Sequence, residues 1–577
     1  MSKTFFAEGA RTRCPSTLPH SPSLQRRSSW MSCAHFVLFF LVELIAVQRT
    51  FAQAPESYRG LLTPSVRSGK MAAPDHMKDY VRDGRLSISL RDAILFTLEN
   101  NSAIRIEESQ METQKFALLS AYQPFDPLIQ GALIVNRYSY SGYSQLQGVG
   151  ESTSSVLNSL SQTGQITYTQ TFTTGTNIVA GISSVKSSTN SSFYYFNPYF
   201  NSALNFQFTQ PLLRNAGRFP NTATLVIARR TLQQSRASFE AQVNDAILQV
   251  VSQYWEAVQA RGALDVQKKS LDLAEVSYKR DKRALELGAL PPLDIYRSES
   301  QVAARKVDVI QASYALTQAE EALRLTIGAE QDPQFRTLEL DLTEKPQPDG
   351  ELASANSETA LKEALDHRPE MDVALKSLAN DETSIQFAHN QLKPDMSLTG
   401  FYQSSGLGGN QYDLNTGQLI APGGLGSSLT QLFGFGFPGY GGTLTLKLPV
   451  KNRAGQASLG TALVARSRDL YAGRQIKEQI AHEVSDAVHQ LEEAKLALAA
   501  GTASFDLAEK SLAADQRKFE LGAETNFFVL DSQSKLAQAE LTLLQTQVNY
   551  QIALAALGHA TGSLLDPYHL KIDELTK

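Results

Sequence analysis

Apolar residues recur every seven positions in two long stretches of the chain, and the second stretch repeats the first 234 positions further on. Spacing of this kind, sustained over many turns, is typical of helices that pack side by side as coiled coils. We therefore predict long helices at about 222–287 and about 456–521, each on the order of 100 Å long at 1.5 Å per residue. The first series is Val243, Val250, Ala257, Leu264, Leu271, Tyr278 and Leu285, and the second is Val484, Leu491, Leu498, Phe505, Leu512 and Phe519.

A glycine-centred break ends each of these stretches. The first reads E286-L-G-A-L-P-P-L-D-I295 and the second reads E520-L-G-A-E-T-N-F-F-V529. Glycine readily adopts the left-handed conformation that ends a helix, and the two prolines of the first break prevent the helix from continuing. Because the seven-residue pattern resumes after each break, we predict shorter helices at about 293–328 and about 526–558. At Gly522 a kink within one continuous helix remains an alternative.

The segments that precede the long helices have few charged residues and a two-residue alternation of apolar and polar positions. Residues 128–210 contain only three charged residues and alternate in strand fashion, as in I166-T-Y-T-Q-T-F172 and L204-N-F-Q-F-T209. The second half matches at about 396–449, with M396-S-L-T-G-F401 and L444-T-L-K-L448. Aromatic clusters stand where the second strand of each half begins, as in the interfacial girdles of membrane barrels. A soluble β-sandwich would alternate in the same way, but secretion and the long helices favour a barrel.

The order helix, strands, long helix, turn, helix thus occurs twice. The leading helices are expected at Leu90 to Ser120 and at Thr359 to Gln391, each followed by a proline. We place the first repeat at 85–328, a linker rich in Pro, Asp and Glu at 329–355, the second repeat at 356–563 and a C-terminal tail at 564–577. The duplication predicts one elongated architecture rather than several compact domains.

The N-terminal residues have the features of a secretory signal. The apolar run F36-V-L-F-F-L-V-E-L-I-A-V47 is too short to span a bilayer and is followed by the small residues that signal peptidase requires. We expect a signal peptide and leader at 1–52, with cleavage after Ala52 favoured over Ala54, and Met31 as an alternative start. Residues 53–84 are expected to form a weakly ordered lead-in. After residue 54 no run is long enough for a membrane helix, so a mature chain in a membrane would need a closed barrel.

Composition argues against most chemical functions. The 577-residue chain has 19% charged residues and a net charge of -5, which does not suggest a nucleic-acid partner. Cys14 and Cys33 both precede residue 54, so the rest of the chain has no disulfide framework, thiolate cluster or cysteine nucleophile. His482 and His489 are seven positions apart on one helix face, too far apart for one metal ion. G434-F-G-F-P-G439 lacks the following helix that a phosphate-binding loop needs. We expect no enzymatic activity, no cofactor and no metal.

The repeated order, the phrases Q210-P-L-L-R-N-A-G217 and L448-P-V-K-N-R-A-G455, and the two glycine breaks resemble the TolC-like outer-membrane efflux protein family over residues 86–562. The resemblance implies an α+β membrane protein that assembles as a homotrimer. Each chain would give about four strands to a 12-stranded barrel in the outer membrane, and the helices would form a coiled-coil tunnel across the periplasm. The implied function is the exit duct of a tripartite efflux pump or type I secretion system. Its implied partners are outer-membrane lipid, a periplasmic adaptor protein and an inner-membrane transporter of the RND or ABC class.

The same resemblance assigns the gate and the adaptor contacts to the two breaks. The implied adaptor-contacting turns are Gly288, Ala289 and Leu290 in the first repeat and Gly522, Ala523 and Glu524 in the second. Asp294 and Asp531 match the family's aspartates at the tip and the constriction, where three copies of Asp531 would favour cations. Asp531 as a solvated residue near a helix start remains an alternative. Phe528 replaces a second ring aspartate and Glu524 replaces an arginine, so we expect Phe528 to form an apolar constriction instead.

Two points stay open at this level. A hairpin-like stretch at Gln165 to Val185 exceeds the minimal plan of two strands per repeat, and it extends either the extracellular loops or the strands. A periplasmic or secreted coiled-coil scaffold without channel activity is the alternative function.

Overall fold

The computed structural model describes residues 77–82, 84–141, 156–288, 294–331, 333–348 and 352–568. All of these residues belong to one compact unit of the chain, Ala73–Lys577. The expected signal and leader at 1–52 and most of the expected lead-in at 53–84 lie outside the described residues. Among the described residues, no helix combines the length and the apolar character that a bilayer crossing requires.

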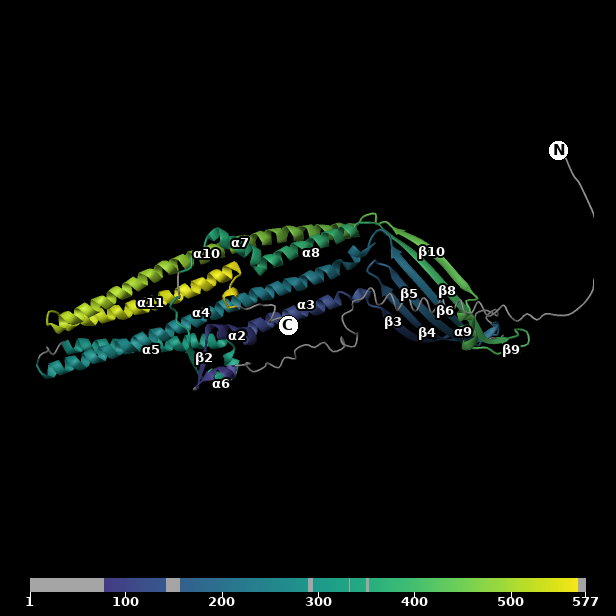
Figure 1. Cartoon of the computed structure of the whole chain (residues 1–577). Coiled ribbons are helices and arrows are strands. Elements are labelled where there is room, and N and C mark those ends of the chain that lie inside the picture. The colour runs from purple at the N-terminus through teal and green to yellow at the C-terminus, as the bar shows by residue number, and fades with distance from the viewer. Residues whose placement is uncertain are drawn as a thin grey trace, which may run out of the picture. The chain divides into compact units, whose positions relative to one another are not determined.

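Two series of elements follow one another in the same order (Figure 1). Both long helices are present: α4 has 69 residues and α10 has 68, so each is about 100 Å long. The first series is α2 (Leu90–Asn100), α3 (Ser102–Ser120), η2 (Gln123–Phe125), β3 (Leu128–Ser141), β4 (Val156–Thr171), β5 (Asn177–Thr189), β6 (Phe196–Pro211), α4 (Arg218–Glu286) and α5 (Asp294–Thr326). The second series is α7 (Ser357–His367), α8 (Pro369–Gln391), β8 (Asp395–Tyr412), β9 (Leu419–Ala421), α9 (Leu425–Phe433), β10 (Pro438–Lys447), α10 (Arg453–Glu520) and α11 (Asn526–Thr561).

Each leading helix, expected as one continuous helix, is broken in two. Between α2 and α3, Asn101 is extended, and its side-chain oxygen accepts the backbone N–H of Ala103 at 2.9 Å as an N-cap. Between α7 and α8, Arg368 is extended because the following proline disfavours a helical conformation at the preceding residue. Both breaks follow from local chemistry. The structure therefore corrects the prediction of one continuous helix to two helices joined by an elbow, at Asn101 in the first repeat and at Arg368 in the second.

The strands form one antiparallel sheet in the order β10-β8-β6-β5-β4-β3, and the short β9 pairs with β8. Six of these strands are long, whereas about four per chain were expected. The additional two are β4 and β5, which contain the hairpin-like stretch at Gln165 to Val185. The sequence left open whether that stretch extends the loops or lengthens the strands, and the structure shows instead that each arm belongs to a full strand of its own.

The two faces of the sheet differ in polarity. Paired residues share a face, and the register joins Ile166 of β4 to Ile182 of β5, and Ile182 to Leu204 of β6. On this face lie Leu133, Val135, Ile166, Ile178, Ile182, Leu204, Phe206, Phe208, Leu398, Tyr440, Leu444 and Leu446. The opposite face carries Thr163, Gln165, Thr167, Ser183, Asn205, Gln207, Thr399, Gln403, Thr443 and Thr445. The sheet is therefore mainly apolar on one side and mainly polar on the other, with exceptions such as Lys186 on the apolar face and Ile134 and Phe401 on the polar face.

The helices form a single layer in which α4 is central. It packs against α3 and α8 in the half near the sheet, and against α5 and α11 in the other half (Figure 1). In contrast, α10 packs against α8 and α11, so it lies at one side of the layer, with α3 and α5 at the other side. Each long helix starts beside the sheet, and its glycine turn therefore lies about 100 Å from the sheet.

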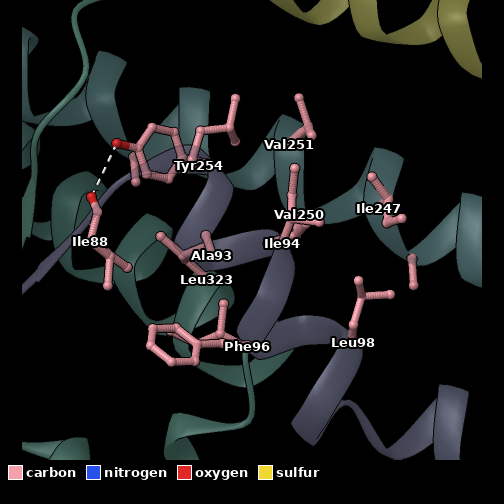
Figure 2. Close-up of a cluster of buried hydrophobic side chains, with 14 of the residues drawn as sticks. Ile88, Ala93, Ile94, Phe96, Leu98, Ile247, Val250, Val251, Tyr254 and Leu323 are labelled. Carbon is pink, nitrogen blue, oxygen red and sulfur yellow. Dashed lines mark hydrogen bonds between the residues drawn. The ribbon is translucent and has the colours of Figure 1, made fainter. Parts of the chain in front are cut away.

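The largest core lies midway along α4, where α2, α5 and a small sheet meet it. Figure 2 shows Ile94 and Phe96 of α2 among the buried side chains of this cluster, together with Val250, Val251 and Tyr254 of α4. The Tyr254 hydroxyl donates to the Ile88 carbonyl at 3.3 Å, and burial raises the pKa of Tyr254 to about 12. This core fixes α2 and the start of α3 to the middle of α4.

Parts of the expected lead-in, linker and tail belong to this core. A three-stranded sheet is formed by β1 (Val81–Arg82), β2 (Arg85–Ile88) and β7 (Glu339–Leu342), and β7 runs parallel to β2. The short helices η1 (Met77–Tyr80), η4 (Ala329–Gln331), α6 (Pro333–Arg336) and η5 (Asp566–Tyr568) contribute Met77, Ala329, Phe335 and Tyr568 to the same cluster. Leu340 and Leu564 are buried in the same cluster. Within the expected linker, residues 339–342 thus form a strand, because their partners lie about 250 residues away in sequence.

Candidate functional site at the helix tips

Both long helices end at a glycine in the left-handed conformation. Gly288 has φ +72° and Gly522 has φ +71°, and a Cβ at either position would meet no atom within 4 Å. In the second turn Gly522 N–H donates to the Phe519 carbonyl at 3.0 Å, and Ala523 N–H donates to the Lys518 carbonyl at 2.9 Å. This is the Schellman pattern of helix termination. The expectation that both glycines end a helix is confirmed, and the kink alternative at Gly522 is wrong.

A serine ties the two helices of each pair together at the same place. We call α4 and α5 the first helical hairpin, and α10 and α11 the second. In the first, the Ser298 hydroxyl of α5 donates to the Asp281 carboxylate of α4. In the second, the Ser532 hydroxyl of α11 donates to Asp515 of α10 at 2.6 Å. Both residues of the second tie lie 234 positions after their counterparts, so the tie is a duplicated feature of the scaffold.

The aspartate of the first hairpin also contacts the second hairpin. Asn526, the first residue of α11, donates from its side-chain amide to both oxygens of Asp281, at 2.9 and 3.2 Å. Arg280 in turn donates to the side-chain oxygen of Asn526. Asp281 is only 6% exposed, so these bonds are shielded from water and are stronger than exposed ones. We call Arg280, Asp281 and Asn526 the inter-hairpin cluster.

Further contacts between the hairpins lie on either side of this cluster. Ser534 of α11 accepts from Gln301 at 3.1 Å and from Arg305 at 2.9 Å, both on α5. Toward the tip, the Arg280 guanidinium lies over the Phe519 ring at 4.7 Å, and that of Arg297 lies over Phe527 at 5.4 Å. Cation–π contacts of this kind contribute about 0.5–1 kcal/mol each at exposed sites. Near the tips the hairpins are therefore joined by polar and cation–π contacts, whereas further from the tips Val548 and Ala555 of α11 pack into the apolar core on α4.

The second tip has charge pairs of its own. Lys518 lies 3.2 Å from Asp515 and 2.9 Å from Glu524. The hydrogen bond from Ser532, together with Lys518, holds the pKa of Asp515 below its usual range. A carboxylate with a lowered folded-state pKa stabilises the fold above its unfolded pKa and loses that contribution only as the pH falls through the lowered value. We therefore expect this tip to keep its ion pairs at neutral and mildly acidic pH.

The structure places the predicted site residues at the two tips without joining them into one cluster. Phe528 is 48% exposed, and its ring lies edge-on to that of Phe527 with centroids 5.5 Å apart. Asp531 pairs with Lys535 on the same helix at 2.7 Å, and Glu524 pairs with Lys518. Asp294 begins α5, and its side chain lies outside the described residues, as do Ala289 and Leu290.

The residues that join the hairpins were not predicted from the sequence. Asp281 and Asn526 hold together helices although they are 245 residues apart in the sequence, and nothing local identifies such a contact. One signal was available, because an aspartate followed 17 positions later by a serine occurs in both repeats at the same offset. Among the described residues, no group of three or more His, Cys, Asp or Glu side chains is placed to hold a metal ion.

Comparison with known proteins places this arrangement in a family. The family model for outer membrane efflux proteins matches residues 177–329 and 360–563, which is more than half of the chain. The chain is 22% identical to the outer membrane protein TolC of Vibrio cholerae serotype O1 over 345 residues, covering 59% of this chain and 73% of that protein.

Two solved channel structures have the same fold. The CmeC outer membrane channel of Campylobacter jejuni matches with a TM-score of 0.59 at 14% identity, covering 92% of this chain and 97% of that one. The MtrE outer membrane channel of Neisseria gonorrhoeae, in its open state, matches with a TM-score of 0.54 at 17% identity, covering 82% and 89%. The described elements thus form the TolC-like α+β fold with its internal duplication. The chain belongs to the outer membrane efflux protein family.

Proposed function

We propose that three copies of this chain form the exit duct of a tripartite efflux pump or type I secretion system. The proposal rests on one observation: among the described residues, the sheet and the helix layer each end in elements without a neighbour on their outer side, and these edges coincide on the same two sides of the chain. On one side lie β3 at the edge of the sheet and α3 and α5 at the edge of the helix layer. On the other side lie β10 and α10. An interface that joins unlike edges produces a closed ring when the rotation between copies closes.

Exposed apolar side chains on these edge helices support this assembly. On α5, Val307, Ile310 and Tyr314 are exposed at a spacing of three and four residues, which is typical of a helix-packing seam. On the opposite edge, α10 exposes Leu463, Val464, Leu470, Tyr471, Leu496 and Leu507. We infer that α10 of one copy covers α3 and α5 of the next. A single chain cannot bury these residues by itself.

The sheet edges complete the same ring. Unpaired backbone groups at β3 and β10 would be costly in lipid, so they pair with each other between copies to close a barrel. The apolar face of the sheet then meets the outer-membrane lipid, and the polar face lines the passage. The helices extend into the periplasm, where the tips meet a periplasmic adaptor and, through it, an inner-membrane RND or ABC transporter that supplies energy. The duct itself carries out no chemistry.

Gating is proposed to occur by separation of the second helical hairpin from the first. The contacts near the tips that would have to break are those of the inter-hairpin cluster, those of Ser534 and the two cation–π contacts, whereas the serine tie within each hairpin would persist. Asp531 and Phe528 stand on the first turns of the moving helix α11, and with Asp294 they would line the constriction. The turns at 288–290 and 522–524 would contact the adaptor.

Planar-bilayer recording on the purified mature chain tests this function. We expect a trimer in detergent, and channels that open more often when the inter-hairpin cluster is removed. The matched membrane experiment is a carbonate wash, after which the chain should stay with the outer membrane. A monomer that washes off and forms no channels would support the coiled-coil scaffold instead.

A further inference from the structure

Two strands of the sheet have no helical counterpart. Four strands connect to helices: β3 follows α3, β6 leads into α4, β8 follows α8, and β10 leads into α10. In contrast, β4 and β5 are joined to each other by a tight turn at this end, where the Phe172 N–H donates to the Thr176 carbonyl at 2.8 Å. The helix layer thus keeps four connections to the sheet per chain, while the sheet has six long strands.

The β4–β5 turn reaches the helix side of the sheet. A Cβ at Gly175 would lie 2.7 Å from the Asn215 carbonyl oxygen and 2.9 Å from a ring carbon of Pro211, both just before α4. The Thr176 hydroxyl also donates to Gln210 near the end of β6. The pairing of β4 with β3 extends to Leu128, and that of β5 with β6 extends to Thr209. The two strands therefore run the full height of the sheet instead of projecting beyond it as an extracellular loop.

Length and pattern are those of membrane-crossing strands. A transmembrane strand needs about 9–11 residues, and β4 has 16 and β5 has 13. Ile166, Tyr168, Ile178 and Ile182 lie on the apolar face shared with β6, and Thr163, Gln165, Thr167 and Ser183 lie on the polar face. The inserted pair thus alternates in phase with its neighbours, which a water-exposed hairpin would have no reason to do.

We propose that β4 and β5 are part of the membrane wall, so that three copies close a barrel of 18 strands above a helical tunnel that keeps four connections per chain. This inference rests on the proposed trimeric channel. Barrel diameter grows roughly linearly with strand number, so the barrel would be about 1.5 times as wide as a 12-stranded one. The membrane section then admits any cargo that passes the helices, and selection by size rests with the tunnel and its tips.

Site-specific fluorescence distinguishes lipid-facing from lumen-facing positions. Single cysteines are introduced into the full-length chain in which Cys14 and Cys33 are replaced by serine, labelled with bimane, and reconstituted in vesicles of brominated phosphatidylcholine. The strand register gives matched positions at the same height of the sheet. Ile166 of β4 lies in one row with Leu204 of β6 on the apolar face, and Thr167 lies in one row with Asn205 on the polar face, so each of these four residues is replaced by cysteine in turn. We expect the brominated lipid to quench Ile166→Cys as strongly as Leu204→Cys, with fluorescence retained at Thr167→Cys and Asn205→Cys.

The control in β6 separates the two ways to fail. Alternating quenching in β6 with none at either β4 position would place the inserted strands outside the wall and overturn the 18-stranded barrel alone. Absence of alternation in β6 as well would overturn the membrane channel itself. Projection images of the unlabelled trimer provide a second measurement, in which a ring of 12-stranded width contradicts the inference and one about 1.5 times wider supports it.

Discussion

The two helical hairpins are built on one plan but are bound to their surroundings differently. Both end at a left-handed glycine, and in both a serine donates to an aspartate across the pair. In the first hairpin that aspartate, Asp281, also receives Asn526 from the second hairpin. In the second hairpin the equivalent Asp515 is bound by Lys518 of its own helix. Duplication therefore supplied the tie, and only one of its two copies holds the hairpins together.

The long helices differ in the same sense. Within the layer α4 has helical neighbours on both of its sides. In contrast, α10 has them on one side and leaves apolar residues exposed on the other. Within one chain the first hairpin is anchored by the core of Figure 2 along α4, whereas the second joins that core through Val548 and Ala555 of α11 and is held near its tip by polar and cation–π contacts. A movement that opens the tips is therefore expected in the second hairpin.

The largest effect is expected from Asp281→Ala. The change removes the acceptor for Asn526 and Ser298, and hydrogen bonds to a charged group contribute about 1.5–3 kcal/mol. Since about 1.4 kcal/mol changes an equilibrium tenfold, the open population should rise roughly 10- to 100-fold. Single-channel recording measures this as open probability.

Asp515→Ala is the matched control for this experiment. It removes the same serine tie from the second hairpin but no contact with the first, so its open probability should stay close to that of the unchanged chain. Equal gains for the two variants would show that loosening either hairpin opens the channel, and the distinction between the two aspartates would fail.

Substitution of the two glycines should destabilise the two helix ends equally. An equal effect would show that the two hairpins share the same turn and differ only in their contacts with each other. At Gly288 and Gly522 a Cβ would meet no neighbour, so alanine introduces only the cost of the left-handed conformation, about 1–2 kcal/mol. Hydrogen exchange at the last turns of α4 and α10 should accelerate by a similar factor in Gly288→Ala and Gly522→Ala. A much larger effect at one tip would mean that another contact holds that glycine.

A smaller effect is expected from Phe528→Ala, which tests a difference between the tips. Phe528 occupies the position of Asp294 in the first repeat, and about half of its surface is exposed beside Phe527. If three copies narrow the passage, truncation should raise single-channel conductance and sensitivity to vancomycin without changing thermal stability by more than about 1 kcal/mol. Phe527→Ala serves for comparison: its ring lies against Arg297 of the first hairpin, so we expect its loss to change the open probability and to leave the single-channel conductance unchanged. Unchanged conductance in Phe528→Ala would exclude an apolar constriction there.

The long helices and the glycine turns were predicted correctly because residues close together in the sequence determine them. The seven-residue pattern predicts the long helices because packing repeats with the helix itself, and a glycine ends a helix through its own backbone conformation. The two elbows were also accessible in principle, since Arg368 precedes a proline and Asn101 is a good N-cap. The strand count was missed because the recognised stretch from Gln165 to Val185 covers only the turn and half of each arm.

The inter-hairpin cluster and the small sheet could not be predicted in this way. The bond between Asp281 and Asn526 exists only after two hairpins have packed side by side, and several other polar residues near the tips would fit the same pattern. Likewise, Leu340 reads as part of a polar linker until β7 pairs with β2. Both depend on which distant segments meet, and that depends on the packing of the whole layer.

The smallest effect is expected from Asp531→Asn, which asks whether the tips differ in charge as well as in contacts. Asp531 is paired with Lys535 at 2.7 Å, and the side chains are 42% and 71% exposed, so solvent and the lysine screen much of the field of Asp531. Three copies around an axis would still attract cations at the constriction. We therefore expect a modest fall in the cation-to-anion permeability ratio, measured from reversal potentials across a salt gradient. Lys535→Gln should raise the same ratio by removing the screening charge. A ratio unchanged in both variants would show that Asp531 is a solvated residue near the start of α11, with no part in the passage.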